Sequence, residues 1–121
     1  SSNKTAANLS VWLVSLPWND RNDAKITDNI ITRGWADPQN HSSLTQSEAL
    51  KAGQFYNLSF ELMPDDQIIP KGQQIGLMIF SSDKEFTPWP EPGTELSVDL
   101  DATTISLPVV GGAEAFKTAI E

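Results

Sequence analysis

The sequence contains no cysteine and a single histidine, His41, among its 121 residues. Without thiols there can be no disulfide and no thiolate nucleophile. A protein zinc site usually needs three or four His, Cys or carboxylate ligands, so one histidine without cysteine argues against zinc. We therefore expect no metal and no cofactor. The lack of cysteine also suits a reducing compartment, and the expected location is cytoplasmic.

Basic residues and long apolar runs are scarce as well. Eight Lys and Arg residues stand against sixteen Asp and Glu, which gives a formal net charge of −8. Nucleic acids and anionic membranes are bound by clustered basic side chains, and no such cluster occurs here. No apolar run approaches the roughly 20 residues that span a bilayer. Neither nucleic acid nor a membrane is therefore an expected partner.

Catalytic patterns are also missing from the sequence. A Ser/His/Asp triad would need His41 as its base, yet no Gly-x-Ser-x-Gly nucleophile motif is present. The carboxylate pairs Asp65/Asp66 and Asp99/Asp101 fall in a turn and on the polar face of a predicted strand. Solvated structural aspartates are the better interpretation of both pairs, because turns favour aspartate. We expect no catalytic residue in this chain.

What the sequence does contain is a series of short segments with alternating apolar and polar residues, separated by Gly, Pro and Asn. Alternation over four to eight residues is typical of a strand with one face in a core. The segment at 74–81 carries apolar residues on both faces and is predicted to be a central strand. The series predicts an all-β sandwich with a short C-terminal helix. The predicted strands are residues 9–16, 30–36, 54–62, 74–81, 95–100 and 104–109.

A few residues within this framework are candidates for binding or close packing. Gly34 interrupts a strand, which indicates a bulge or a close approach by another backbone. Its neighbours Arg33 and Trp35 share one strand face, where they either form a ligand platform or make a structural Arg–Trp or Arg–Asp contact. Trp18 and Trp89 lie in predicted loops, where they either stack on a sugar or pack against a neighbouring domain.

Four stretches in a fixed order carry a resemblance to a known family. They are Ile31–Asn40, Gly53–Asp66, Lys71–Asp83 with its closing Ser-Ser-Asp, and Gly93–Gly112. Together they resemble the C-terminal domain of bacterial Xaa-Pro dipeptidyl-peptidases, within a wider cocaine-esterase-like group of hydrolases. The positions that match the family pattern, for which we expect structural roles, are Arg33, Gly34, Trp35, Gly53, Gly72 and Asp83.

The resemblance implies a galactose-binding-like jelly-roll β-sandwich over residues 9–112. Residues 1–8 would then be a disordered or vector-derived tail, and residues 113–121 a short helix or tail. The parent would be a cytoplasmic, homodimeric serine exopeptidase that releases Xaa-Pro dipeptides from peptide N-termini. Its Ser, Asp and His would lie in an upstream α/β-hydrolase domain, which also receives the peptide substrate. The present chain would be a non-catalytic accessory domain that shapes substrate access or packs between domains.

Two alternatives and one structural expectation accompany this hypothesis. The chain could instead be a carbohydrate-binding module, which needs exposed aromatic residues on one surface. It could also be the equivalent domain of a related esterase or acylase. The family's sandwich begins with a further strand or two before Leu9, so an unpaired strand edge is expected here. That edge would drive self-association or be covered by the N-terminal segment.

Overall fold

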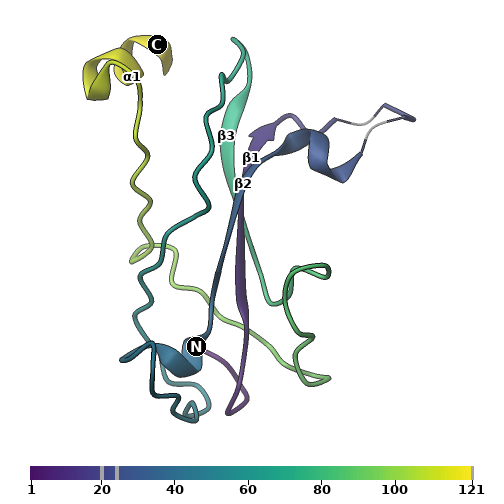
Figure 1. Cartoon of the computed structure of the whole chain (residues 1–121), viewed down its shortest axis with the longest axis vertical. Helices are drawn as coiled ribbons and strands as arrows, with labels where there is room; N and C mark the ends of the chain where they lie inside the picture. Colours follow the sequence, from purple (N-terminus) through teal and green to yellow (C-terminus); the bar gives the residue numbers. More distant parts are fainter. Residues whose placement is uncertain (20, 24, 121) are drawn as a thin grey trace.

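In a computed structural model that describes residues 1–19, 21–23 and 25–120, the chain is built on one antiparallel sheet. The sheet has the order β2-β1-β3 (Figure 1). Two short 3-10 turns, η1 (Ile26–Asn29) and η2 (Pro38–Asn40), flank β2. The prediction of an all-β chain with a short C-terminal helix is confirmed. The elements of the sheet and the helix are β1 (Leu9–Leu16), β2 (Ile30–Ala36), β3 (Gln74–Phe80) and α1 (Gly112–Ile120).

The centre of the sheet is β1, and the prediction that residues 74–81 form the central strand is wrong. β1 pairs with both β2 and β3, and its residues from Ser10 to Val14 are all buried. β3 lies at the edge of this three-stranded sheet, where Ile75 and Met78 each remain 40% exposed. Both segments carry apolar residues on both faces, so the sequence pattern could not decide which of them has two neighbours.

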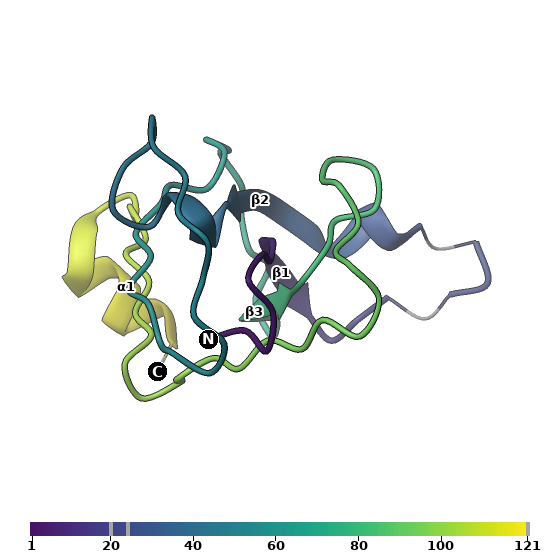
Figure 2. The same ribbon diagram turned by 90° about the horizontal axis from the view of Figure 1, so that it is seen from below.

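The other predicted strands run as extended segments without a ladder. We call residues 54–62 and 104–109 the outer segments, and Figures 1 and 2 show them side by side, on one side of the sheet. Within residues 54–62 the side chains still alternate, because those at 56, 58, 60 and 62 are half-buried while those at 57, 59 and 61 are exposed. The predicted orientation is therefore confirmed for residues 54–62. The described structure has no strand over residues 54–62, 95–100 or 104–109, and the pairing seen within these ranges is an isolated bridge between Ser2 and Leu96.

Gly34 is the point where an outer segment touches the sheet. A Cβ atom built on Gly34 would lie 2.5 Å from Leu62 Cδ2 and 3.1 Å from the carbonyl oxygen of Glu61. One residue further on, the Met63 N–H donates to the Arg33 carbonyl at 2.7 Å. The predicted close approach of another backbone is thus confirmed at Gly34. The irregularity in the β1–β2 ladder lies elsewhere, between Leu13 and Val14 of β1, whereas Gly34 pairs with Val11.

The N-terminal residues are held in place, which corrects the expectation of a disordered tail over residues 1–8. The Ser1 amino group donates to the Ser97 carbonyl at 2.7 Å, and Ser2 forms a β-bridge with Leu96. Ser2 and Ala7 are both buried. The contacts of Ser1 and Ser2 join backbones more than 90 residues apart in the sequence. The polar composition of the N-terminal segment gives no indication of such contacts. The N-terminal segment covers residues 95–97 rather than an edge of the three-stranded sheet.

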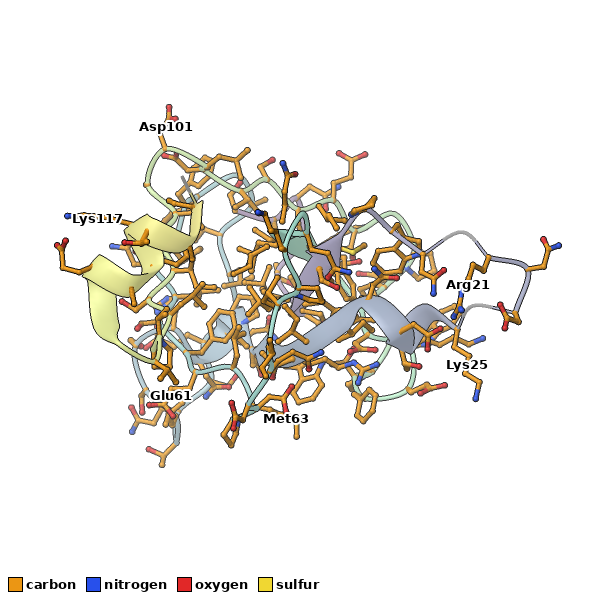
Figure 3. All side chains as sticks on the ribbon, turned by 90° about the horizontal axis from the view of Figure 1, so that it is seen from above. Arg21, Lys25, Glu61, Met63, Asp101 and Lys117 are labelled. Carbon is orange, nitrogen blue, oxygen red and sulfur yellow. The ribbon has the colours of Figure 1, made fainter. Side chains whose placement is uncertain are left out.

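The helix α1 stands apart from the core. The Lys117 ammonium lies 3.1 Å from the Glu114 carboxylate, but no residue of α1 is buried. Its apolar residues Phe116 and Ile120 are 36% and 67% exposed. Figure 3 shows Lys117 at one end of the molecule and Arg21 and Lys25 at the other. No helix in the described ranges has the length and apolar character needed to span a bilayer.

Candidate functional site

The most distinctive chemical site is centred on Asp83, just beyond the end of β3. The Asp83 side chain is only 5% exposed, and one of its carboxylate oxygens, Oδ2, is contacted by three N–H-bearing groups. The indole N–H of Trp12 donates to it at 2.7 Å and that of Trp35 at 3.3 Å. The guanidinium Nε of Arg33 lies 3.4 Å away as an ion-pair partner. A buried carboxylate is tolerated only when it is paired in this way.

The register of the sheet explains why these groups meet. Trp12 of β1 lies directly opposite Arg33 of β2, and Ser10 lies opposite both Trp35 of β2 and Phe80 of β3. Residues opposite one another, or two apart along a strand, share a face of the sheet. One face of the three strands therefore collects these residues, and the chain leaving β3 brings Asp83 onto that same face.

Aromatic rings hold the arginine on both sides. The Arg33 guanidinium carbon lies 5.3 Å from the centre of the Trp12 ring and 5.0 Å from that of Phe86. The Trp35 and Phe86 rings stack at 5.3 Å with an interplanar angle of 27°. Each cation–π contact of this kind contributes roughly 0.5–2 kcal/mol. We call Trp12, Arg33, Trp35, Asp83 and Phe86 the Asp83 cluster.

The backbone of Asp83 also fixes the loop that follows it. The Asp83 carbonyl accepts the N–H groups of Phe86 at 2.8 Å and Thr87 at 2.9 Å. The Asp83 N–H reaches the buried Ser10 hydroxyl at 3.1 Å and the Thr87 hydroxyl at 3.0 Å. Further along, the Asn8 side-chain amide donates to the Pro88 carbonyl at 2.7 Å. The loop is thus tied at its start to Ser10 of β1 and at its middle to Asn8, the residue just before β1.

This arrangement has no capacity for nucleophilic or acid–base chemistry of its own. The described groups around the Asp83 carboxylate are two indoles, an arginine and a phenyl ring, none of which is a nucleophile. The Oδ2 atom of this carboxylate is already shared by two indole N–H donors and the Arg33 guanidinium. Of the two sequence-based interpretations, the geometry matches the structural one, an arginine paired with an aspartate and stacked on tryptophan.

A second place brings together residue types of a catalytic triad without forming one. Asp37, His41 and Ser59 line a shallow hollow of about 240 Å³ beside Trp35. The Asp37 carboxylate accepts the Gln39 N–H at 2.9 Å, and the His41 ring stacks on Tyr56 with centroids 4.4 Å apart. No hydrogen bond joins His41 to the serine or the aspartate. His41 is therefore a packed loop residue rather than a general base.

The carboxylate pairs have structural or solvated surroundings. Asp65 and Asp66 are exposed, and Asp99 Oδ1 accepts the backbone N–H groups of Asp101 and Ala102 within its own turn. Within the described ranges, no group of three or more His, Asp or Glu side chains converges on a point where a metal ion could sit.

The remaining predicted residues are scattered. Gly53 and Gly72 have φ angles of +77° and +88° and form turns before residues 54–62 and β3. Trp89, 72% exposed, follows Pro88 near the N-terminal end of β1, whereas Trp18, 37% exposed, lies beyond the C-terminal end of that strand. Eight strand residues span about 26 Å at 3.3 Å per residue, so the two indoles do not form one sugar-binding surface.

Three residues of the site were missed by sequence reasoning. Trp12 was assigned only to a strand face, and its partnership with Arg33 depends on a register that the sequence does not state. Ser10 is 0% exposed and looked like any polar strand residue. Phe86 sits in a proline-rich loop. An aromatic residue three positions after a strand-ending Ser-Ser-Asp was the one available signal for it.

Comparison with known proteins agrees with this architecture. The profile of a family described as the X-Pro dipeptidyl-peptidase C-terminal non-catalytic domain matches residues 1–118. The chain belongs to this family. The match includes the whole three-stranded sheet, the Asp83 cluster and both outer segments. It also includes residues 1–8, of which residues 1–3 are bonded to residues 95–97.

Individual relatives give the same assignment. A protein of Rhodopirellula baltica, provisionally named an Xaa-Pro dipeptidyl-peptidase, is 66% identical over 109 residues, which is 90% of this chain and 17% of the relative. A provisionally named Xaa-Pro dipeptidyl-peptidase of Bacillus cereus is 38% identical over 107 residues, or 88% of this chain and 17% of the relative. The chain thus spans about a sixth of the length of these relatives. No solved structure shows significant similarity to the chain.

Proposed function

We propose that this chain is the accessory domain of a serine exopeptidase that releases Xaa-Pro dipeptides, and that it packs against an α/β-hydrolase domain of the same parent. The catalytic Ser, Asp and His belong to that other domain in this proposal. The family match supports it, because that family is described as a non-catalytic C-terminal domain. The proposal includes a homodimeric parent in the cytoplasm.

The observation that carries the packing role is the loop that the Asp83 cluster anchors. Phe86 and Trp89 on this loop are 53% and 72% exposed, although the loop backbone is hydrogen-bonded to Ser10 of β1 and to Asn8, just before β1. A large apolar side chain on a firmly held loop loses little conformational freedom on contact, which favours its use as an interface anchor. The loop would thereby set the distance between this domain and the substrate entrance.

The test uses the full-length parent with an Ala-Pro chromogenic substrate. We expect Trp89→Ala to raise KM or to loosen the domain contact, measured as faster proteolysis between the domains, while kcat changes little. Trp18→Ala is the matched control, since this second exposed indole lies at the opposite end of β1. If both variants behave like the parent, the loop is not the packing surface. If the parent does not hydrolyse the substrate, the peptidase assignment itself fails.

A further inference from the structure

The Arg33 guanidinium is the charged group of the Asp83 cluster whose hydrogen-bonding capacity is unused. Its Nε atom is buried and makes no hydrogen bond to a described residue, because the Asp83 carboxylate 3.4 Å away pairs the charges without hydrogen-bond geometry. Its two Nη groups likewise have no hydrogen bond to the part of the chain that the structure describes, but they are not sealed from solvent. The side chain is only 21% exposed. A guanidinium that has lost most of its water is costly unless oxygen acceptors replace that water.

The guanidinium is also held in place before any further acceptor arrives. The rings of Trp12 and Phe86 lie 5.3 Å and 5.0 Å from its central carbon, and Asp83 lies on its Nε side. An arginine fixed in this way loses little side-chain entropy on binding. Its two Nη groups form a planar fork whose spacing matches the two oxygens of a carboxylate. The cluster is therefore arranged to receive a carboxylate at the Nη edge of Arg33.

The sheet face around Arg33 has the composition of the centre of an interface. Met78 of β3 lies directly opposite Trp12 on this face and is 40% exposed, and Phe86 is 53% exposed. Arginine, methionine and aromatic residues are enriched where one protein surface meets another. A small anion on Arg33 would leave Met78 and Phe86 exposed, whereas a polypeptide surface would cover them together with the guanidinium. The composition of this face therefore favours a polypeptide as the source of the carboxylate.

The described part of the chain does not supply that carboxylate. Asp65 lines the same hollow of about 300 Å³ as Arg33 and Met63, but no ion pair joins Asp65 to Arg33. A second copy of the chain is a poor source, since each copy carries a net charge of −8 and the two would repel. The chain spans 17% of the length of its relatives, so the rest of the parent polypeptide offers a far larger choice of carboxylates.

We propose that the sheet face carrying the Asp83 cluster docks against the rest of the parent polypeptide, and that an Asp or Glu side chain from there pairs with both Nη groups of Arg33. The guanidinium is then shared between Asp83 of its own domain, on the Nε side, and a carboxylate from outside the domain, on the Nη side. This inference rests on the proposed packing of the domain within its parent, but not on what that parent hydrolyses.

Chemical modification of this chain's two arginines in the intact parent tests the contact. Phenylglyoxal reacts with guanidinium groups, and Arg21, whose side chain is 67% exposed, is the internal control. Exposure alone, 67% against 21%, predicts that Arg33 reacts about threefold more slowly than Arg21. We expect a difference on the order of 100-fold, because two charge-assisted hydrogen bonds must break first. A difference no larger than exposure predicts would overturn the proposal. Protection that needs an added anion, or that disappears when the parent is diluted to monomer, would overturn it as well.

Two double variants of the full-length parent separate this role of Arg33 from its pairing with Asp83. Arg33→Met with Asp83→Asn removes both charges but keeps a side-chain oxygen for the two indoles, so the domain should still fold. Arg21→Met with Asp23→Asn is the matched control, because it removes an exposed ion pair of 3.7 Å and also leaves the net charge unchanged. We expect the first variant to speed proteolysis between the domains by on the order of 100-fold, since two charge-assisted hydrogen bonds are lost. The control should leave the rate unchanged.

Hydrogen exchange of the β1 amides in the same variant shows whether the domain itself is intact. If it is not, Arg33→Lys takes its place, because lysine keeps a charge beside Asp83 but lacks the planar fork. We expect Arg33→Lys to speed the proteolysis by on the order of 10-fold, since one of the two hydrogen bonds is lost. Proteolysis as slow as in the control would overturn the proposal. If Trp89→Ala still loosened the domains in that case, the proposed function would stand and this contact alone would fail.

Discussion

The three-stranded sheet and the outer segments come from the same kind of sequence but differ in what their backbones bind. Both are extended and carry apolar residues at alternate positions, and in β1 and β3 the apolar residues fall on both faces. In the sheet, β1 is hydrogen-bonded on both sides and buries five consecutive residues. In the outer segments the side chains are oriented in the same way, but the backbone groups of residues 55–62 have no partner in the described structure. Alternation therefore determines which way side chains point, and pairing decides whether a segment is a stable strand.

The largest effect on the three-stranded sheet is expected from a substitution of Asp83. Asp83→Ala would leave two indole N–H groups and the Arg33 guanidinium without their shared acceptor. Removing one partner of a buried ion pair costs about 3–5 kcal/mol. We expect a loss of this size in the local stability of β1, measured by hydrogen exchange in the intact protein. Asp66→Ala, at an exposed aspartate, is the control and should change it by less than about 0.5 kcal/mol.

The contact between the two regions is tested next, at Gly34. Gly34→Ala would place a methyl group 2.5 Å from Leu62 Cδ2 and 3.1 Å from the Glu61 carbonyl. Overpacking of this kind costs about 1–3 kcal/mol, and we expect it as a loss of thermal stability. Adding Leu62→Ala should recover part of the loss, because the two sites touch and their effects are not additive. A double variant less stable than either single variant would contradict this contact.

A smaller effect is expected at the Ser10 hydroxyl, which accepts the Asp83 N–H at the start of the loop after β3. Ser10→Ala removes one of the two acceptors for the Asp83 N–H, while the Thr87 hydroxyl remains at 3.0 Å. With one acceptor still in place, the cost should be about 1 kcal/mol. Hydrogen exchange at the Asp83 backbone N–H measures this loss of stability directly. Thr87→Ala combined with Ser10→Ala should cost more than the sum of the two single changes, since no hydroxyl acceptor would then remain.

The smallest effect is expected outside both regions. Ile68 is 88% exposed in the turn between residues 54–62 and β3. Ile68→Ser should change the free energy of unfolding by less than about 0.5 kcal/mol, as surface substitutions generally do. Chemical denaturation of the intact protein is the measurement. A loss above about 1 kcal/mol would mean that the Ile68 side chain is buried in the intact protein.

The sequence was sufficient for the local features and insufficient for the pairings. Apolar, β-branched and aromatic residues located β1, β2 and β3, and Gly53 and Gly72, for which the sequence predicts structural roles, have positive φ angles. Pairing depends on the register between residues distant in sequence, such as Trp12 opposite Arg33. The residue pattern of one strand does not identify the strand with which it pairs. For this reason the sequence alone predicts β3, rather than β1, as the central strand. It is also why Ser10, a buried acceptor for Asp83, was not recognised.

The backbone bonds between Ser1 and Ser97 bear on the order in which the chain assembles. They close a loop 96 residues apart in sequence, whereas β1 and β2 are joined by the short connection from Leu16 to Ile30. The entropy lost on closing a loop grows with its length, and contacts between distant residues slow folding. We expect β1 and β2 to pair first, β3 to join them, and the two distant serines to meet last. The same bonds would be the first to open when the chain unfolds.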